Sequence, residues 1–249
     1  MSKQLKNYTQ KKLQGVFGQK KGGIILILPS QYYEENLYPL QDGVMNTISK
    51  CGVRFFLTGG TALSRAHYNH RYSDDLDFFV NNDANYLDQV KEIFFKLKED
   101  GFFWDSNLDF VSNNTFTSFK VGWKKSDTLL KLDFVNDVSA HFGEISKTDL
   151  YYRTDSIRNM LSNKLTALFR FSPKDVVDIR EIALHESVNW AHAINDARQK
   201  EAGLESVYIS DILTGMPQSE FETIAWTKKP SWDEFRHDIE KIVFDIMQG

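Results

Sequence analysis

Short, mostly apolar runs that favour β-strands recur along the first part of the chain. The runs of this character cover residues 53–58, 76–80, 115–121 and 128–135. Between them, the apolar residues of the stretch 87–97 recur at the three- and four-residue spacing of a helix that buries one face. A mixture of strands and single-faced helices predicts a layered α+β structure.

Helical spacing prevails after residue 150. The stretches that favour helices are 156–170, 173–187, 190–201 and 231–247. Ser231 and Glu234 form the sequence pattern of a capping box, which marks the start of the last helix. We therefore expect a mixed-sheet core over residues 1–150 and a helical C-terminal lobe over residues 151–249, packed together with a cleft between them.

Three aspartates stand among apolar neighbours on the predicted strands. Asp75 and Asp77 flank Leu76, so a strand would place both carboxylates on one face and Leu76 in the core. Two carboxylates held that close repel each other unless a cation lies between them or one is protonated. Asp133 is the acid of the run 128–135. If the two strands are neighbours, the three acids converge into an oxygen-only site, which favours magnesium.

Asp133 also has a structural alternative, because Lys131 lies on the same face of that strand and can pair with it. A zinc site is not expected. His67 and His70 are close in the sequence, but Cys51 is the only cysteine of the chain, so the partners of a structural zinc site are scarce.

A glycine pair, Gly59-Gly60, separates the first strand-like run from a helix-favouring stretch at residues 61–66. Glycine permits close approach of a ligand to the backbone, and the first N–H groups of a helix attract anions. The pair therefore suits a phosphate cradle, with a tight turn that binds no ligand as the alternative.

Two blocks of residues resemble a known family. The first contains Gly59-Gly60-Thr61, the run Arg71-Tyr72-Ser73-Asp74-Asp75-Leu76-Asp77, and Asp133. The second contains Lys164 and Arg170, followed by Lys174-Asp175-Val176-Val177-Asp178. In this order they resemble the DNA polymerase-beta-like nucleotidyltransferase superfamily, in its AbiEii-like branch of toxins. The resemblance covers roughly residues 53–182.

The resemblance implies a nucleotidyltransferase that moves a nucleoside monophosphate from a nucleoside triphosphate to a hydroxyl acceptor. Asp75, Asp77 and Asp133 would be catalytic and would bind Mg²⁺, or Mn²⁺, with Asp133 deprotonating or orienting the acceptor. The nucleotide contacts that it implies are Gly59, Gly60, Thr61, Arg71, Ser73, Lys164, Arg170, Lys174, Asp175 and Asp178. The implied partners are the triphosphate, RNA, tRNA or a protein as acceptor, and a cognate antitoxin.

Structural alternatives remain open for the second block. Asp175 lies where a capping-box acid of a helix beginning at Pro173 belongs, and Lys174 and Asp178 are one helical turn apart and can pair on the surface. Lys164 can be a solvated lysine. Two other functions also remain open: a noncatalytic module of the same fold that binds an antitoxin, RNA or protein, and an enzyme that modifies a small molecule such as an antibiotic.

Composition limits the class of protein. The 249 residues are 41% hydrophobic and 14% aromatic, which is enough for a substantial core. We expect a cytoplasmic protein, because one cysteine cannot form an intramolecular disulfide and no apolar run has membrane-spanning length or the pattern of a signal peptide. The net charge of −4 argues against broad coating of nucleic acid but allows a local basic groove. Lysines that suggest either a solvated terminus or an RNA-binding arm are Lys3, Lys6, Lys11, Lys12, Lys20 and Lys21.

Overall fold

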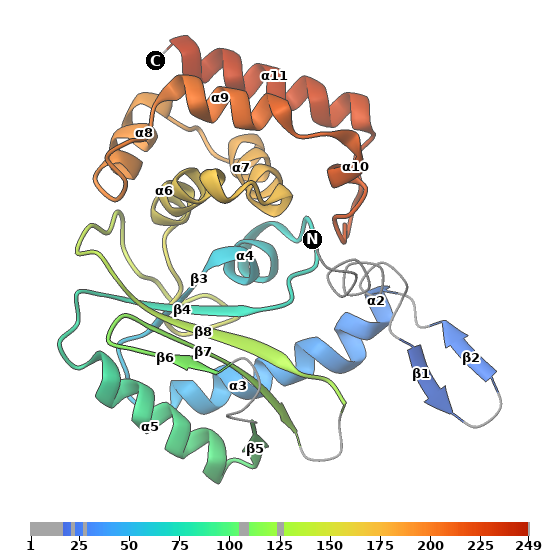
Figure 1. The fold of residues 1–249 in the computed structure, drawn as a ribbon, viewed down its shortest axis with the longest axis vertical. Coiled ribbons are helices and arrows are strands. Elements are labelled where there is room, and N and C mark those ends of the chain that lie inside the picture. The colour runs from blue at the N-terminus through green and yellow to red at the C-terminus, as the bar shows by residue number, and fades with distance from the viewer. Residues whose placement is uncertain (1–16, 21–22, 27–28, 105–109, 124–126, 249) are drawn as a thin grey trace, which may run out of the picture.

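The computed structural model describes residues 17–20, 23–26, 29–104, 110–123 and 127–248. A six-stranded sheet lies between layers of helices, with a separate two-stranded hairpin to one side (Figure 1). Apart from Lys20, the lysines that suggested an RNA-binding arm lie outside the described residues.

The sheet is mixed, as the sequence predicts. Its strands are β3 (Phe56–Thr58), β4 (Leu76–Asn81), β5 (Phe102–Phe103), β6 (Val111–Ser112), β7 (Phe116–Trp123) and β8 (Leu130–Asp137). Their order is β3-β4-β8-β7-β5, and β6 pairs with β7. Strands β4 and β8 are parallel, and the other strand pairs described in this sheet are antiparallel. The hairpin consists of β1 (Phe17–Lys20) and β2 (Gly23–Leu26).

Strands β4 and β8 each bury one face, which fixes their register. Leu76 and Phe78 of β4, and Leu132 and Phe134 of β8, are fully buried. The rings of Phe78 and Phe134 stack with their centroids 5.4 Å apart. Because side chains alternate along a strand, burial of these residues turns the intervening aspartates toward the opposite face of the sheet.

Helices cover both faces of the sheet. They are α2 (Pro29–Tyr32), a π-helical turn (Tyr33–Leu37), α3 (Tyr38–Ser49), α4 (Gly59–Thr61) with a π-helical continuation (Ala62–Tyr68), α5 (Tyr86–Glu99), α6 (Ile157–Ala167) with a 3₁₀ turn (Leu168–Arg170), α7 (Pro173–His185), α8 (Trp190–Arg198), α9 (Ser206–Gly215), α10 (Gln218–Phe221) and α11 (Trp232–Gln248). Helices α3 and α5 lie on one face, and α4, α6 and α7 lie on the other (Figure 1). Helices α8, α9 and α11 form an outer layer over α6 and α7.

The segment before α6 ties the helical part of the chain to the sheet. The N–H of Leu57 donates to the carbonyl of Arg153 at 2.8 Å, and the N–H of Asp155 donates to the carbonyl of Leu57 at 2.9 Å. The side chain of Ser156 then caps α6 by accepting a hydrogen bond from the N–H of Asn159. These bonds place the start of α6 beside the end of β3, where Gly59 begins α4.

The predicted elements are found, with shifted ends. The strand expected at 53–58 is only Phe56–Thr58, and the strand expected at 128–135 continues to Asp137. The Ser231–Glu234 capping box is confirmed by reciprocal hydrogen bonds. The helical stretch 29–49 was not predicted, because Pro39 and Gly43 interrupt its pattern. Among the described residues, none of the helices combines the length and apolar character needed to cross a bilayer.

Candidate active site

Two aspartates lie side by side on the parallel strand pair. Asp77 of β4 and Asp133 of β8 are direct partners in the ladder. Asp75 precedes β4, and the hydroxyl of Thr61 donates to its carbonyl at 2.5 Å. The three acids that the sequence singles out are therefore brought to one region by the alignment of β4 with β8.

The side chain of Asp133 is already bonded within the sheet. Lys131 Nζ lies 2.5 Å from Asp133 Oδ2, and Ser118 Oγ donates to Asp133 Oδ1 at 2.6 Å. The structural alternative for Asp133 is thus the arrangement that the structure shows. Ser118 is a partner that the sequence did not indicate; it is the residue of β7 directly opposite Asp133.

The glycine pair is required by close contacts on both sides. Gly59 has φ of +71°, and a Cβ atom there would collide with Oδ2 of Asp77. A Cβ atom at Gly60 would collide with Nη2 of Arg71 and would come within 3.1 Å of the hydroxyl oxygen of Ser73. The turn therefore presses directly against the Asp77 carboxylate, which explains why side chains are absent at these two positions.

Burial and repulsion from neighbouring carboxylates disfavour the charged forms of Asp75 and Asp77. Burial, Asp133 and Asp75 raise the pKa of Asp77 to about 6, against the opposing effect of Lys164 and Lys131. Burial and the adjacent Asp74 also raise the pKa of Asp75. At neutral pH the Asp77 carboxylate is therefore charged, although burial and its acidic neighbours disfavour that form.

A second charge cluster, on α6 and α7, is well compensated. Lys164 Nζ lies 2.8 Å from Asp175 Oδ1 and 2.6 Å from Asp178 Oδ2. Arg170 donates two hydrogen bonds to Asp175, at 2.7 and 2.9 Å. Arg71 Nε and Nη2 each donate to Asp178 at 2.7 Å. Asp175, Asp178, Arg71 and Lys164 are buried, whereas the Arg170 side chain reaches Asp175 from the surface. We call these five residues the helical charge network.

Opposite charges set the protonation of this network. Burial alone would raise the pKa of Asp178, but Arg71 and Lys164 hold it well below its ordinary value. Burial would lower the pKa of Lys164, but Asp178 and Asp175 raise it, so the ammonium group stays charged. His70 Nε2 also lies 2.8 Å from Asp178 Oδ1.

The network decides between the alternatives for the second block. The interpretation of Lys164 as a solvated lysine is wrong, because it is buried and holds two carboxylates. The Lys174–Asp178 surface pair is also wrong: Lys174 Nζ bonds Asp74 at 2.9 Å. Asp175 does not act as a capping-box acid, since its carboxylate faces Lys164 and Arg170 and the Ser172 side chain makes no cap bond.

Arg71 and Ser73 lie behind the glycine turn and do not line the pocket described next. The carbonyl of Ser73 accepts a hydrogen bond from Gln41 Nε2 at 3.0 Å. Arg71 is 2% exposed and both ends of its guanidinium contact Asp178, so it links the turn to α7.

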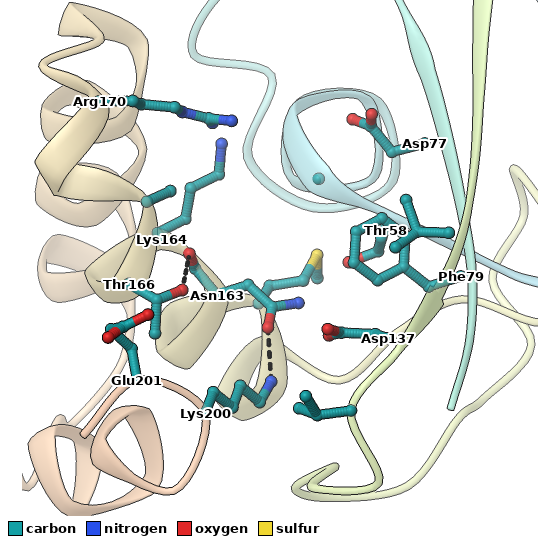
Figure 2. Close-up of a pocket in the computed structure, with 15 residues that line it drawn as sticks. Thr58, Asp77, Phe79, Asp137, Asn163, Lys164, Thr166, Arg170, Lys200 and Glu201 are labelled. Carbon is teal, nitrogen blue, oxygen red and sulfur yellow. Dashed lines mark hydrogen bonds between the residues drawn. The ribbon is translucent and has the colours of Figure 1, made fainter. Parts of the chain in front are cut away.

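A pocket of about 390 Å³ separates the sheet from α6. Gly59 and Asp77 line its sheet side, and Lys164 and Arg170 line its helical side (Figure 2). The sequence analysis singled out all four of these residues. It missed Asp137, Asn163 and Lys200, which also line the pocket. Asp137 could have been found from the two-residue period that starts at Asp133, whereas nothing in the sequence marks Lys200.

The strand acids fit a divalent cation by charge and by donor type. Carboxylate oxygens are the ligands that Mg²⁺ and Mn²⁺ prefer. The pKa of Asp77 is raised first by burial and then by repulsion from Asp133 and Asp75, and a cation would relieve that repulsion. Among the described residues, however, no three His, Cys, Asp or Glu side chains are gathered into a metal-binding group. The Asp133 carboxylate is instead bonded to Lys131 and Ser118.

Comparisons with solved structures show the same fold. The chain resembles MenT4, a nucleotidyltransferase toxin of Mycobacterium tuberculosis, with a TM-score of 0.65 and 14% identity over 89% of this chain and 86% of that one. It also resembles JHP933 of Helicobacter pylori, with a TM-score of 0.60 and 18% identity over 86% of this chain and 91% of that one. The structure of a putative nucleotidyltransferase from H. pylori gives a TM-score of 0.51 and 18% identity over 84% of this chain and 94% of that one.

None of the curated proteins matches the chain significantly. The family described as "Nucleotidyl transferase AbiEii toxin, Type IV TA system" matches residues 45–241, which include the glycine turn, Asp75, Asp77, Asp133 and the helical charge network. The fold and this match over most of the chain agree with the resemblance seen in the sequence, and the chain belongs to the AbiEii nucleotidyltransferase toxin family.

Proposed function

We propose that the pocket binds a nucleoside triphosphate with Mg²⁺, or Mn²⁺, and that the protein transfers the nucleoside monophosphate to a hydroxyl group of RNA, tRNA or a protein. The observation that carries this proposal is the arrangement of charge across the pocket. Asp77 faces it from the sheet, and Lys164 and Arg170 face it from the helical side. Carboxylates suit cations, and fixed basic groups suit phosphate oxygens, so the two sides together match a metal–triphosphate complex.

The residues divide the work of this transfer. Lys164 and Arg170 bind and orient the phosphates, and Asp175 and Asp178 act as positioning residues because they hold those basic side chains in place. Gly59 allows the phosphates to approach the backbone. A divalent cation held by Asp75 and Asp77, with Asp133 beside them, would offset negative charge on the transferring group.

In the reaction, the acceptor oxygen forms a bond to the α-phosphorus, and the bond from that phosphorus to the bridging oxygen of the β-phosphate breaks. Pyrophosphate leaves with the electron pair. The acceptor's proton passes to a carboxylate oxygen of Asp133, which lies in the ladder directly beside Asp77. Family membership further supports a toxin with a cognate antitoxin partner, acting in the cytoplasm.

The test compares the wild type with the Asp75→Asn/Asp77→Asn double variant. Each protein is incubated with each labelled triphosphate and total cellular RNA, with Mg²⁺, with Mn²⁺, or with EDTA. We expect labelled product only with a divalent ion, and a loss of at least about 100-fold in the double variant. One gel reports the donor nucleotide and whether RNA or protein is the acceptor.

Asp88→Asn is the matched control, because Asp88 is an exposed residue that pairs with Lys91 on α5, on the opposite face of the sheet. It should retain full activity. Equal activity of the double variant, or activity that EDTA leaves unchanged, would reject the assigned chemistry. A folded wild-type protein that binds no triphosphate would favour the noncatalytic module.

A further inference from the structure

The pocket extends beyond the residues discussed so far. One end lies near Lys164 and Arg170, and the other is lined by Asp137 and Lys200, with Asn163 between them on α6 (Figure 2). Asp137 follows Asp133 by four residues on β8, which corresponds to about 13 Å along a strand. That separation is comparable to the span of a nucleoside from its 5′-phosphate to the far edge of its base.

The walls between the two ends are apolar. Phe79 and Val135 are direct partners on β4 and β8 and line the pocket from the sheet. Met160 of α6 lines it from the helical side. An aromatic ring and aliphatic side chains on facing walls suit a flat, weakly hydrated ring system, because they bury its faces and leave its polar edge to groups at the end of the slot.

The polar groups at this end are fixed and have unused hydrogen-bonding capacity. Lys200 Nζ donates to Asn159 Oδ1 at 2.7 Å and to Asn163 Oδ1 at 2.5 Å, which leaves one of its three N–H groups. Since the oxygen of Asn163 accepts from Lys200, its amide nitrogen is left to face the pocket (Figure 2). Among the described residues, no side chain forms a hydrogen bond or an ion pair within 4 Å with the carboxylate of Asp137, although it is half-buried.

We propose that this end of the pocket is the nucleobase subsite, and that it selects bases that carry an exocyclic amino group. The inference rests on the proposed function, since it assumes that a nucleoside triphosphate occupies the pocket. A carboxylate can only accept hydrogen bonds, so Asp137 requires an N–H donor on the base. Lys200 and the amide nitrogen of Asn163 can only donate, so they match the ring nitrogen or carbonyl oxygen beside that amino group.

Replacing the amino group by a carbonyl reverses this match. Two acceptors, the carbonyl oxygen and the carboxylate, would then face each other, and a half-buried carboxylate without a donor is costly. Three pairs of nucleotides differ in this way at a single ring position: CTP against UTP, ATP against ITP, and GTP against XTP. The subsite should therefore prefer CTP to UTP and, where purines bind, ATP to ITP or GTP to XTP.

Calorimetric titration with the α,β-methylene analogues of these six nucleotides, in the presence of Mg²⁺, measures the preference without turnover. We expect the wild type to bind the amino-bearing member of at least one pair about tenfold or more tightly. In Asp137→Asn the ratio should fall toward unity, because an amide can turn to present either an oxygen or an N–H group. Lys200→Met should weaken both members of a pair. Tripolyphosphate, which has no base, should bind the wild type and both variants equally.

Asp88→Asn serves again as the control and should keep the wild-type ratio, and circular dichroism checks that each variant is folded. Equal binding within every one of the three pairs by the wild type, or a ratio that Asp137→Asn leaves unchanged, would overturn the base subsite while leaving the proposed transferase intact. Absence of binding by every nucleotide and by tripolyphosphate would overturn the proposed function, and the subsite with it.

Discussion

Two clusters of acidic residues, one at the start of β4 and one on α7, are in opposite electrostatic states. On the sheet, Asp75 and Asp77 are crowded by other carboxylates, and the pKa of Asp77 is raised to about 6. On α7, Asp175 and Asp178 are more deeply buried, yet Lys164, Arg170 and Arg71 surround them and the pKa of Asp178 is lowered. Burial acts in the same direction on Asp77 and Asp178, so the difference comes from their neighbours.

The difference suggests different roles: Asp75 and Asp77 would bind a ligand, and the helical charge network would position other side chains. The helical charge network is complete without a ligand, and its function is to hold Lys164 and Arg170 at the pocket. At Asp75 and Asp77, burial and neighbouring carboxylates outweigh the effect of the nearby lysines, which fits the cation site that we propose. Neutralising one acid in each cluster should therefore change the stability of the protein in opposite directions.

The largest expected effect is the destabilisation of the helical charge network by Asp178→Asn. The variant leaves Arg71 and Lys164 buried with half of their counter-charge removed. Breaking a buried ion pair in this way costs about 3–5 kcal/mol in the free energy of unfolding. Urea denaturation followed by circular dichroism measures the loss. A change below about 1 kcal/mol would show that the network contributes little to folding.

A smaller effect of opposite sign is expected for Asp77→Asn. The pKa of Asp77 rises from 3.8 in the reference state to about 6 in the fold. Below pH 4 the carboxyl group is protonated in both states and the variant has no advantage. Between pH 4 and 6 the Asp77 carboxyl group is ionised in the unfolded chain but still largely protonated in the folded protein, which destabilises the wild type. Above pH 6 the full difference, up to about 3 kcal/mol in favour of the variant, is present.

Denaturation curves of both proteins, recorded without divalent ions from pH 4 to 7.5, measure that difference. The variant should gain stability relative to the wild type as the pH rises, while its transferase activity is lost. A gap that stays constant with pH, or a variant that is less stable at pH 7, would contradict the repulsion inferred at Asp77.

The smallest effect is expected for Lys174→Ala. This variant tests the ion pair by which Lys174 of α7 contacts Asp74, the residue next to Asp75. Lys174 bonds Asp74, but its side chain is 41% exposed. A solvent-screened pair of this kind contributes at most about 1 kcal/mol, so stability should change by a few tenths. Activity should change less than in Lys164→Met, because Lys174 does not line the pocket. A loss as large as that of Lys164→Met would place Lys174 among the nucleotide contacts.

The sequence predicted much of the fold because local patterns control it. The alternation around Leu76 and Phe78 specifies a strand with one buried face, and the Ser231–Glu234 pair specifies a helix start. The positions of Asp137 and Lys200 at the pocket were not predicted. Lys200 lies just after α8, far from the strands in sequence, and only the packing of α8 against α6 brings it to the pocket.

By itself, the sequence determined the residue types of the site and the elements that carry them: the glycine turn, the acids of two strands, and the basic and acidic residues of two helices. Only the tertiary structure decided which charges neutralise one another. It paired Lys164 with Asp175 and Asp178, joined Lys174 to Asp74, and left Asp77 beside Asp133. The physical reason is that a charge takes its partner from whatever lies within a few ångströms, and that distance is set by the packing of segments remote in the chain.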